Sequence, residues 1–123
     1  MPVGHPYPPE QHEIDAAWIL ARHFQCAVEF LSPIDDYKRK TADIIMQGST
    51  WEIKCPIGES KSTIRNQFRR ASKQSKNIII DTRRTKLNIE NVNKSVYKEI
   101  RERPYIKKII LIDKFEKVIE IEL

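Results

Sequence analysis

Two carboxylates and a lysine are spaced in this chain so that they could hold a divalent metal ion and activate a water molecule. Eight residues separate Asp43 from Glu52, and Lys54 follows two positions later. The segment 44–53 consists of two short apolar runs around a Gln-Gly-Ser turn, which is typical of a β-hairpin. Because side chains alternate along a strand, Glu52 and Lys54 share one face, and cross-strand pairing brings Asp43 close to them. Oxygen ligands and a nearby ammonium group are what a metal-dependent hydrolase requires.

The elements that must position these residues follow from size, composition and hydrophobic periodicity. With 123 residues, 40% apolar and 32% charged, the chain should form one domain over 1–123, beginning with an irregular, proline-rich arm at 1–11. Neither an apolar run near 18 residues nor a signal-peptide pattern occurs, so we predict no membrane partner and a cytoplasmic site of action. The two cysteines, Cys26 and Cys55, are expected to be reduced, buried thiols inside strands.

The order of the predicted elements favours an α/β fold. The expected elements are a helix at 12–24, a strand at 26–31, the hairpin at 44–54, a helix at 62–75 beginning at Ser62 as N-cap, a buried strand at 77–81, a helix at 90–102 and a terminal hairpin at 105–123. An α/β sandwich with a mixed central sheet packs these elements most naturally. Trp18 and Trp51 both fall on apolar faces and are predicted to be in the core.

A cluster of positive charge indicates an anionic partner. The net charge is +5, and residues 61–86 hold nine basic side chains against one acid, Asp81. The basic residues are Lys61, Arg65, Arg69, Arg70, Lys73, Lys76, Arg83, Arg84 and Lys86. Such clustering is the electrostatic signature of nucleic-acid binding, although a solvated helix face is the better explanation of a charge run when nothing else accompanies it.

Asp43, with Glu52-x-Lys54, resembles the D-(x8)-E-x-K signature of the PD-(D/E)XK nuclease superfamily, with Ala42 in place of the family's proline. The resemblance implies a restriction-endonuclease-like αβββαβ core, here followed by a C-terminal helix and hairpin. It also implies that Asp43 and Glu52, with Glu13 from the first helix, bind Mg²⁺ or Mn²⁺ and that Lys54 positions or helps to deprotonate the attacking water. Two structural alternatives remain: Glu13 can serve the helix dipole, and Lys54 can form a cross-strand salt bridge.

The segments DIIMQGSTWEIKCP, STIRNQFRRASKQS and NIIID, within residues 41–86, are similar to CdiA-type C-terminal tRNase toxin domains of contact-dependent growth inhibition. This resemblance implies cleavage of RNA, with tRNA as substrate, and a cognate immunity protein as partner. The expected nucleic-acid-binding residues are Lys61, Arg65, Gln67, Arg69, Arg70 and Lys73. They would contact the phosphate backbone and so position the substrate without reading its sequence.

Three other functions remain open at this point. The first is a metal-independent ribonuclease toxin of the barnase/EndoU/colicin/RelE-like group, which uses the RNA 2′-OH as nucleophile. The second is a DNA-cleaving PD-(D/E)XK nuclease, and the third is a basic module that binds nucleic acid without catalysis. His12 and His23 are more typical of packing or surface positions than of general bases, and Tyr37 could stack on a base.

Overall fold

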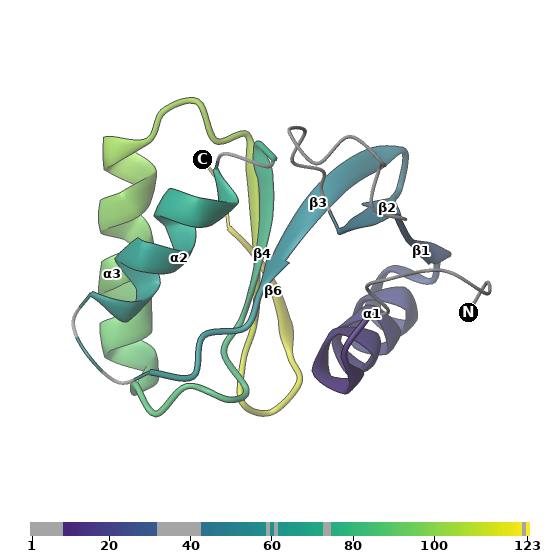
Figure 1. Ribbon diagram of the computed structural model, residues 1–123, viewed down its shortest axis with the longest axis horizontal. Helices are drawn as coiled ribbons and strands as arrows, with labels where there is room; N and C mark the ends of the chain where they lie inside the picture. Colours follow the sequence, from purple (N-terminus) through teal and green to yellow (C-terminus); the bar gives the residue numbers. More distant parts are fainter. Residues whose placement is uncertain (1–8, 32–42, 59, 61, 73–74, 122) are drawn as a thin grey trace.

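The computed structural model describes residues 9–31, 43–58, 60, 62–72, 75–121 and 123, which fold into a mixed six-stranded sheet with three helices (Figure 1). The elements are α1 (Gln11–Phe24), β1 (Val28–Phe30), β2 (Ile44–Met46), β3 (Ser49–Lys54), α2 (Thr63–Ala71), β4 (Asn77–Asp81), α3 (Ile89–Glu102), β5 (Lys108–Ile112) and β6 (Val118–Ile121). This order confirms the predicted α/β fold class. In the described part of the chain, no helix is long and apolar enough to cross a membrane.

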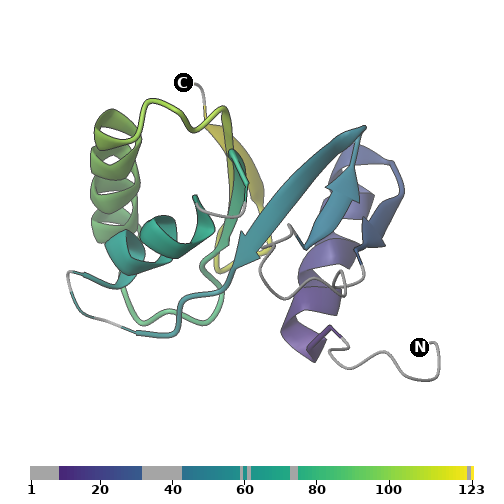
Figure 2. The same ribbon diagram turned by 45° about the horizontal axis from the view of Figure 1, so that its top comes forward.

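The sheet has the strand order β1-β2-β3-β4-β5-β6, with β3, β4 and β5 parallel and the outer pairs antiparallel. Helices α2 and α3 connect the parallel strands and cover one face, whereas α1 lies on the other side (Figures 1 and 2). Each face has its own core. Alternate residues of β4 divide between them: Ile79 packs with residues of α1, and Ile78 and Ile80 pack with residues of α2 and α3. This alternation is the reason for the continuous apolar run in the sequence.

Several predicted boundaries are corrected by the structure. Gln11 already belongs to α1, so the irregular arm is shorter than predicted, and residues 1–8 lie outside the described part. The second helix ends at Ala71 rather than residue 75, and Ser62 is its N-cap without a side-chain capping bond. Cys26 precedes β1 and Cys55 follows β3, and both are only half-buried. Tertiary packing sets where a strand begins and ends, and the short apolar runs do not encode it.

The two tryptophans differ, and the prediction for Trp18 is wrong. Trp51 is 3% exposed, stands opposite Ile44, and its indole nitrogen donates to the carbonyl of Met46 at 3.3 Å. Trp18 is 65% exposed. Helix α1 contacts the sheet through Ala16, Ala17, Ile19 and Leu20. Trp18 lies outside this buried stripe of the helix.

The β2–β3 turn consists of two residues with positive φ, Gln47 at 52° and Gly48 at 77°. Such two-residue turns match the twist of the flanking strands. No atom lies within 4 Å of a Cβ placed on Gly48, so substitution there meets a backbone penalty and no clash. We expect Gly48→Ala to lower the free energy of unfolding by about 1 kcal/mol, measured by urea unfolding. A Lys94→Ala control on the exposed face of α3 should remain within about 0.5 kcal/mol of the parent protein.

Candidate active site

The carboxylates meet where strand β3 changes partners. Residues 49–51 of β3 pair with β2, and residues 52–54 pair with β4. Since Ile44 is opposite Trp51, Asp43 stands opposite Glu52. The Asp43 amide donates to the carbonyl of Trp51 at 3.0 Å, and its Oδ2 accepts the amide of Ile53 at 2.9 Å. The Asp43 carboxylate therefore takes the place of a β2 backbone acceptor, and this holds the carboxylate beside Glu52. We call the site formed by Asp43, Glu52 and Lys54, where β3 changes partners, the β3 fork.

Glu52 is buried without full compensation of its polar atoms. Its side chain is 1% exposed, and its Oε2 has no hydrogen-bond partner among the described residues. Burial raises the pKa of Glu52 to about 9, and the Asp43 carboxylate adds to this increase through a shared hydrogen bond and its charge. The Lys54 ammonium lowers the same pKa, and Glu13 raises it slightly further. A buried carboxylate in this state must take up either a proton or a cation.

Lys54 lies on the same face of β3 as Glu52, as predicted from strand alternation. Its charge affects the pKa of Glu52, so the ammonium is near the carboxylates. The alternative cross-strand salt bridge is absent: among the described residues, no carboxylate oxygen lies within 4.0 Å of Lys54 Nζ. The half-buried Lys54 is thus available to a substrate or water at the fork.

Glu13 occupies a different local environment from Asp43 and Glu52. Its Oε1 accepts the amide of Glu10 at 3.1 Å, which is half of a capping box at the start of α1. Potential ligand atoms of Glu10, His12 and Glu13 all lie within 4.8 Å of one another. Glu13 does not form such a set with the two fork carboxylates in the described part of the chain. The structural alternative for Glu13 is therefore present, and its metal-binding role stays a prediction.

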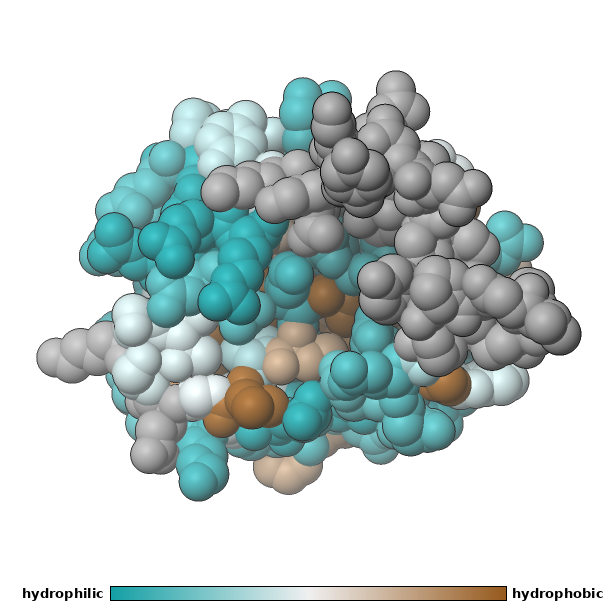
Figure 3. Space-filling view, in the orientation of Figure 1, coloured by the Kyte–Doolittle hydropathy of each residue, from teal (hydrophilic) through white to brown (hydrophobic). Residues whose placement is uncertain are grey.

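The basic helix α2 covers the face that carries Glu52 and Lys54. Ile64, Phe68 and Ala71 are its buried residues, as predicted, and they pack beside Ile78 and Ile80 of β4. Arg65, Arg69 and Arg70 are exposed, and Gln67 is half-buried. In the space-filling view, strongly hydrophilic side chains gather over α2 and α3 (Figure 3). Two other predicted contacts, Lys61 and Lys73, lie outside the described residues, as does Tyr37.

A second charged cluster, which the sequence analysis did not identify, lies at the ends of β3 and β4. Asp81 is 0% exposed, and its carboxylate accepts three hydrogen bonds from the Arg83 side chain at 2.6–3.1 Å. The Cys55 thiol donates to Asp81 at 3.5 Å, and burial followed by the Asp81 charge raises the pKa of this thiol. Arg83 Nη2 also donates to the carbonyl of His12 at 3.1 Å, which ties α1 to the end of the sheet.

This cluster changes the interpretation of the basic segment. Arg83 is one of the nine basic residues of segment 61–86, and the structure pairs it with the one acid in that segment. The available signal was the position of Asp81 at the carboxyl end of a buried apolar strand. The carboxyl ends of parallel strands meet at one edge of a sheet, so a residue there lies beside the end of β3.

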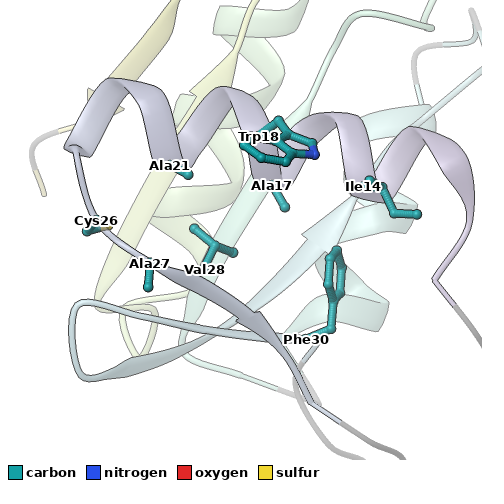
Figure 4. A pocket seen from close by; sticks show the side chains of 8 residues that line it. All are labelled: Ile14, Ala17, Trp18, Ala21, Cys26, Ala27, Val28 and Phe30. Atoms are coloured by element: carbon teal, nitrogen blue, oxygen red, sulfur yellow. The ribbon is translucent and has the colours of Figure 1, made fainter. Parts of the chain in front are cut away.

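A separate apolar groove of about 420 Å³ lies between α1 and β1 (Figure 4). Its lining includes the exposed Trp18 together with Ile14, Val28 and Phe30. It contains none of the predicted site residues, so we assign the candidate active site to the β3 fork.

Comparisons with known proteins are consistent with this architecture. The family described as "Contact-dependent growth inhibition CdiA C-terminal domain" matches residues 40–118, whereas curated protein sequences gave no match. A chain of the "CdiA-CT/CdiI toxin and immunity complex from Burkholderia pseudomallei" is similar in fold, with a TM-score of 0.65 and 19% identity over 96% of this chain and 92% of that chain. The family match covers more than half of the chain and includes all three fork residues. The chain therefore belongs to the CdiA C-terminal domains, the toxin domains of contact-dependent growth inhibition.

Proposed function

We propose that this domain is a metal-dependent nuclease of the PD-(D/E)XK type that hydrolyses phosphodiester bonds of RNA, with tRNA as the expected substrate. The observation that carries the proposal is Glu52. This buried carboxylate has an unpartnered oxygen and stands against a second carboxylate, Asp43. Carboxylates repel phosphate unless a cation lies between them, so a nucleic-acid-binding protein has no use for this pair without a metal.

The residues at the fork fit Mg²⁺ or Mn²⁺. Asp43 and Glu52 offer oxygen ligands only, which hard divalent cations prefer, and the unpartnered Oε2 of Glu52 provides one such ligand. Glu13 would complete the set through water. When bound, such an ion polarises the phosphate and lowers the pKa of a bound water.

The chain's own residues supply the remaining functions. Lys54 is near the carboxylates and has no ion-pair partner within 4.0 Å among the described residues, so its ammonium can orient the attacking water and offset negative charge on the oxygens of the phosphorane-like transition state. Arg65, Arg69 and Arg70 are exposed on the helix above this face, and they would hold the substrate backbone. Gln67, half-buried on the same helix, would contact a phosphate or the water.

We also propose a cognate immunity protein as partner. The Burkholderia pseudomallei chain of similar fold comes from a toxin and immunity complex. A cytoplasmic nuclease that cleaves tRNA would harm the cell that makes it, so an inhibitor that binds the domain is a physical requirement of this function.

The function is tested by incubating the purified protein with total tRNA and with plasmid DNA, each in Mg²⁺, Mn²⁺ or EDTA. We expect tRNA cleavage that requires a divalent metal. Cleavage of DNA instead would move the substrate assignment to DNA, and RNA cleavage in EDTA with 2′,3′-cyclic phosphate ends would favour the metal-independent mechanism. The absence of cleavage in every condition would contradict the proposal.

Lys54→Ala should reduce the rate of tRNA cleavage by about 10²-fold because it removes the ammonium beside the reacting phosphate. The measurement is single-turnover cleavage of labelled tRNA, with circular dichroism to confirm that the variant folds. Lys98→Ala on the exposed face of α3 removes the same charge elsewhere and should leave the rate within about twofold. Full activity in Lys54→Ala would remove Lys54 from the catalytic residues.

A further inference from the structure

The carboxyl ends of the three parallel strands lie at one edge of the sheet, the edge from which the β5–β6 hairpin extends. Strand β3 ends at Lys54, β4 at Asp81 and β5 at Ile112, and all three strands run in the same direction. Adjacent strands are about 4.8 Å apart, so β5 is only about 10 Å from β3 across the sheet. Lys54 is in register with Ile80 of β4 and Leu111 of β5, one residue before each strand ends, so the loops that follow β4 and β5 begin on the Lys54 side of the fork.

Thr85 forms hydrogen bonds that connect the loop after β3 with the β5–β6 hairpin. It is buried, and its hydroxyl donates to the carbonyl of Gly58, in the loop after β3, at 2.6 Å. Its own carbonyl accepts a hydrogen bond from the Lys114 ammonium at the hairpin. The Thr82 hydroxyl adds a bond of 2.7 Å to the carbonyl of Ile112. The hairpin is thus held in a defined position relative to the strand that carries Glu52 and Lys54.

Phe115 at the tip of this hairpin is 91% exposed. It borders a pocket of about 500 Å³ at the start of α3, whose lining includes Leu87, Ile89, Lys86 and Lys114. Asp113 also lines the pocket, and its Oδ1 accepts the amides of Phe115 and Lys117 at 2.8 and 2.9 Å, which fixes this carboxylate in the turn. The pocket therefore combines an apolar floor, one exposed aromatic ring and two lysines against one carboxylate.

We propose that this pocket is a substrate subsite in which an unpaired nucleotide stacks on Phe115 while Lys86 and Lys114 contact its phosphates. An aromatic ring with flanking cations is what single-stranded nucleic acid requires, because every base has a π-face and every linkage a negative charge. An exposed phenylalanine contributes nothing to the core of the domain. The proposal rests on the proposed nuclease function and names the part of the RNA that the enzyme holds beside the cleaved bond.

The test compares wild type with Phe115→Ala and Phe115→Trp on a fluorescein-labelled single-stranded oligoribonucleotide. Phe115→Ala should raise KM, and also the Kd measured by fluorescence anisotropy in a Glu52→Gln background, by about 5- to 150-fold, with kcat within about twofold. Phe115→Trp should restore both values because it keeps the stacking surface. Tyr97→Ala removes another exposed aromatic ring, on α3, and should behave as wild type.

Unchanged KM and Kd in Phe115→Ala would overturn the subsite. So would loss of self-association in Phe115→Ala with RNA binding intact, measured by sedimentation velocity, because Phe115 would then belong to a protein interface. The nuclease proposal fails separately: if wild type binds the oligoribonucleotide without cleaving it, the effect of Phe115→Ala on Kd still decides the subsite. If wild type neither binds nor cleaves RNA, both proposals are wrong.

Discussion

Glu52→Gln should abolish cleavage and at the same time stabilise the metal-free protein. The rate should fall by at least about 10³-fold, because the substitution removes one charged ligand of the proposed metal, an effect worth several kcal/mol. In metal-free buffer at pH 7, the free energy of unfolding should instead increase by on the order of 3 kcal/mol. A substitution that abolishes activity but raises stability is typical of a residue that the reaction requires and whose burial is unfavourable for folding.

The stability gain follows from the raised pKa of Glu52. The pKa is about 9 in the folded protein against 4.5 for an ordinary glutamate side chain, so the folded state binds more protons than the unfolded state between these pH values. The wild-type protein therefore loses stability as the pH rises through this range, by up to about 1.4 kcal/mol per pH unit. A glutamine amide has no proton to lose, so this loss should disappear in the variant.

Urea unfolding at pH 5, 7 and 8.5 in EDTA measures this difference. Glu120→Gln, an exposed carboxylate on β6, is the matched control and should retain the wild-type pH dependence. Added Mg²⁺ should stabilise wild type at pH 8.5 and leave Glu52→Gln unchanged, because only the wild-type site gains a ligand. Parallel pH profiles for wild type and Glu52→Gln would show that Glu52 is not the buried proton acceptor inferred from its geometry.

Arg83→Met should lower the free energy of unfolding by about 3 kcal/mol. Asp81 is fully buried, and the side chain of Arg83 supplies most of its hydrogen bonds. Removing the guanidinium leaves a buried carboxylate without its counter-charge, which costs far more than the net contribution of the intact pair. The bond to the carbonyl of His12 is lost as well, which weakens the attachment of α1.

The double variant Asp81→Asn/Arg83→Met separates charge from packing. It removes both members of the pair, and we expect it to recover most of the stability that Arg83→Met loses. The double-mutant cycle should give a coupling energy of at least about 2 kcal/mol between the two residues. Arg84→Met changes the neighbouring exposed arginine and should remain within about 0.5 kcal/mol of wild type. An Arg83→Met variant as stable as wild type would show that Asp81 is not held by this pair.

The sequence by itself determined the fold class, the order of the elements and the shared face of Asp43, Glu52 and Lys54. Each of these depends on local periodicity: alternation places Glu52 and Lys54 together, and the Gln47-Gly48 turn sets the pairing that brings Asp43 opposite Glu52. The continuous run in β4 likewise predicted a strand covered on both faces. The resemblance to CdiA C-terminal domains, confirmed by the family match, also depended on contiguous residues.

Only the tertiary structure decided how these elements meet. The orientation of α1 leaves Trp18 exposed, because the helix buries the stripe formed by Ala16, Ala17, Ile19 and Leu20, and contact with the sheet decides which stripe that is. The pairing of Arg83 with Asp81 and the connection from Gly58 through Thr85 to Lys114 join loops that are far apart in the sequence. Parallel strands bring distant segments to one edge of a sheet, and no local pattern records which side chains meet there.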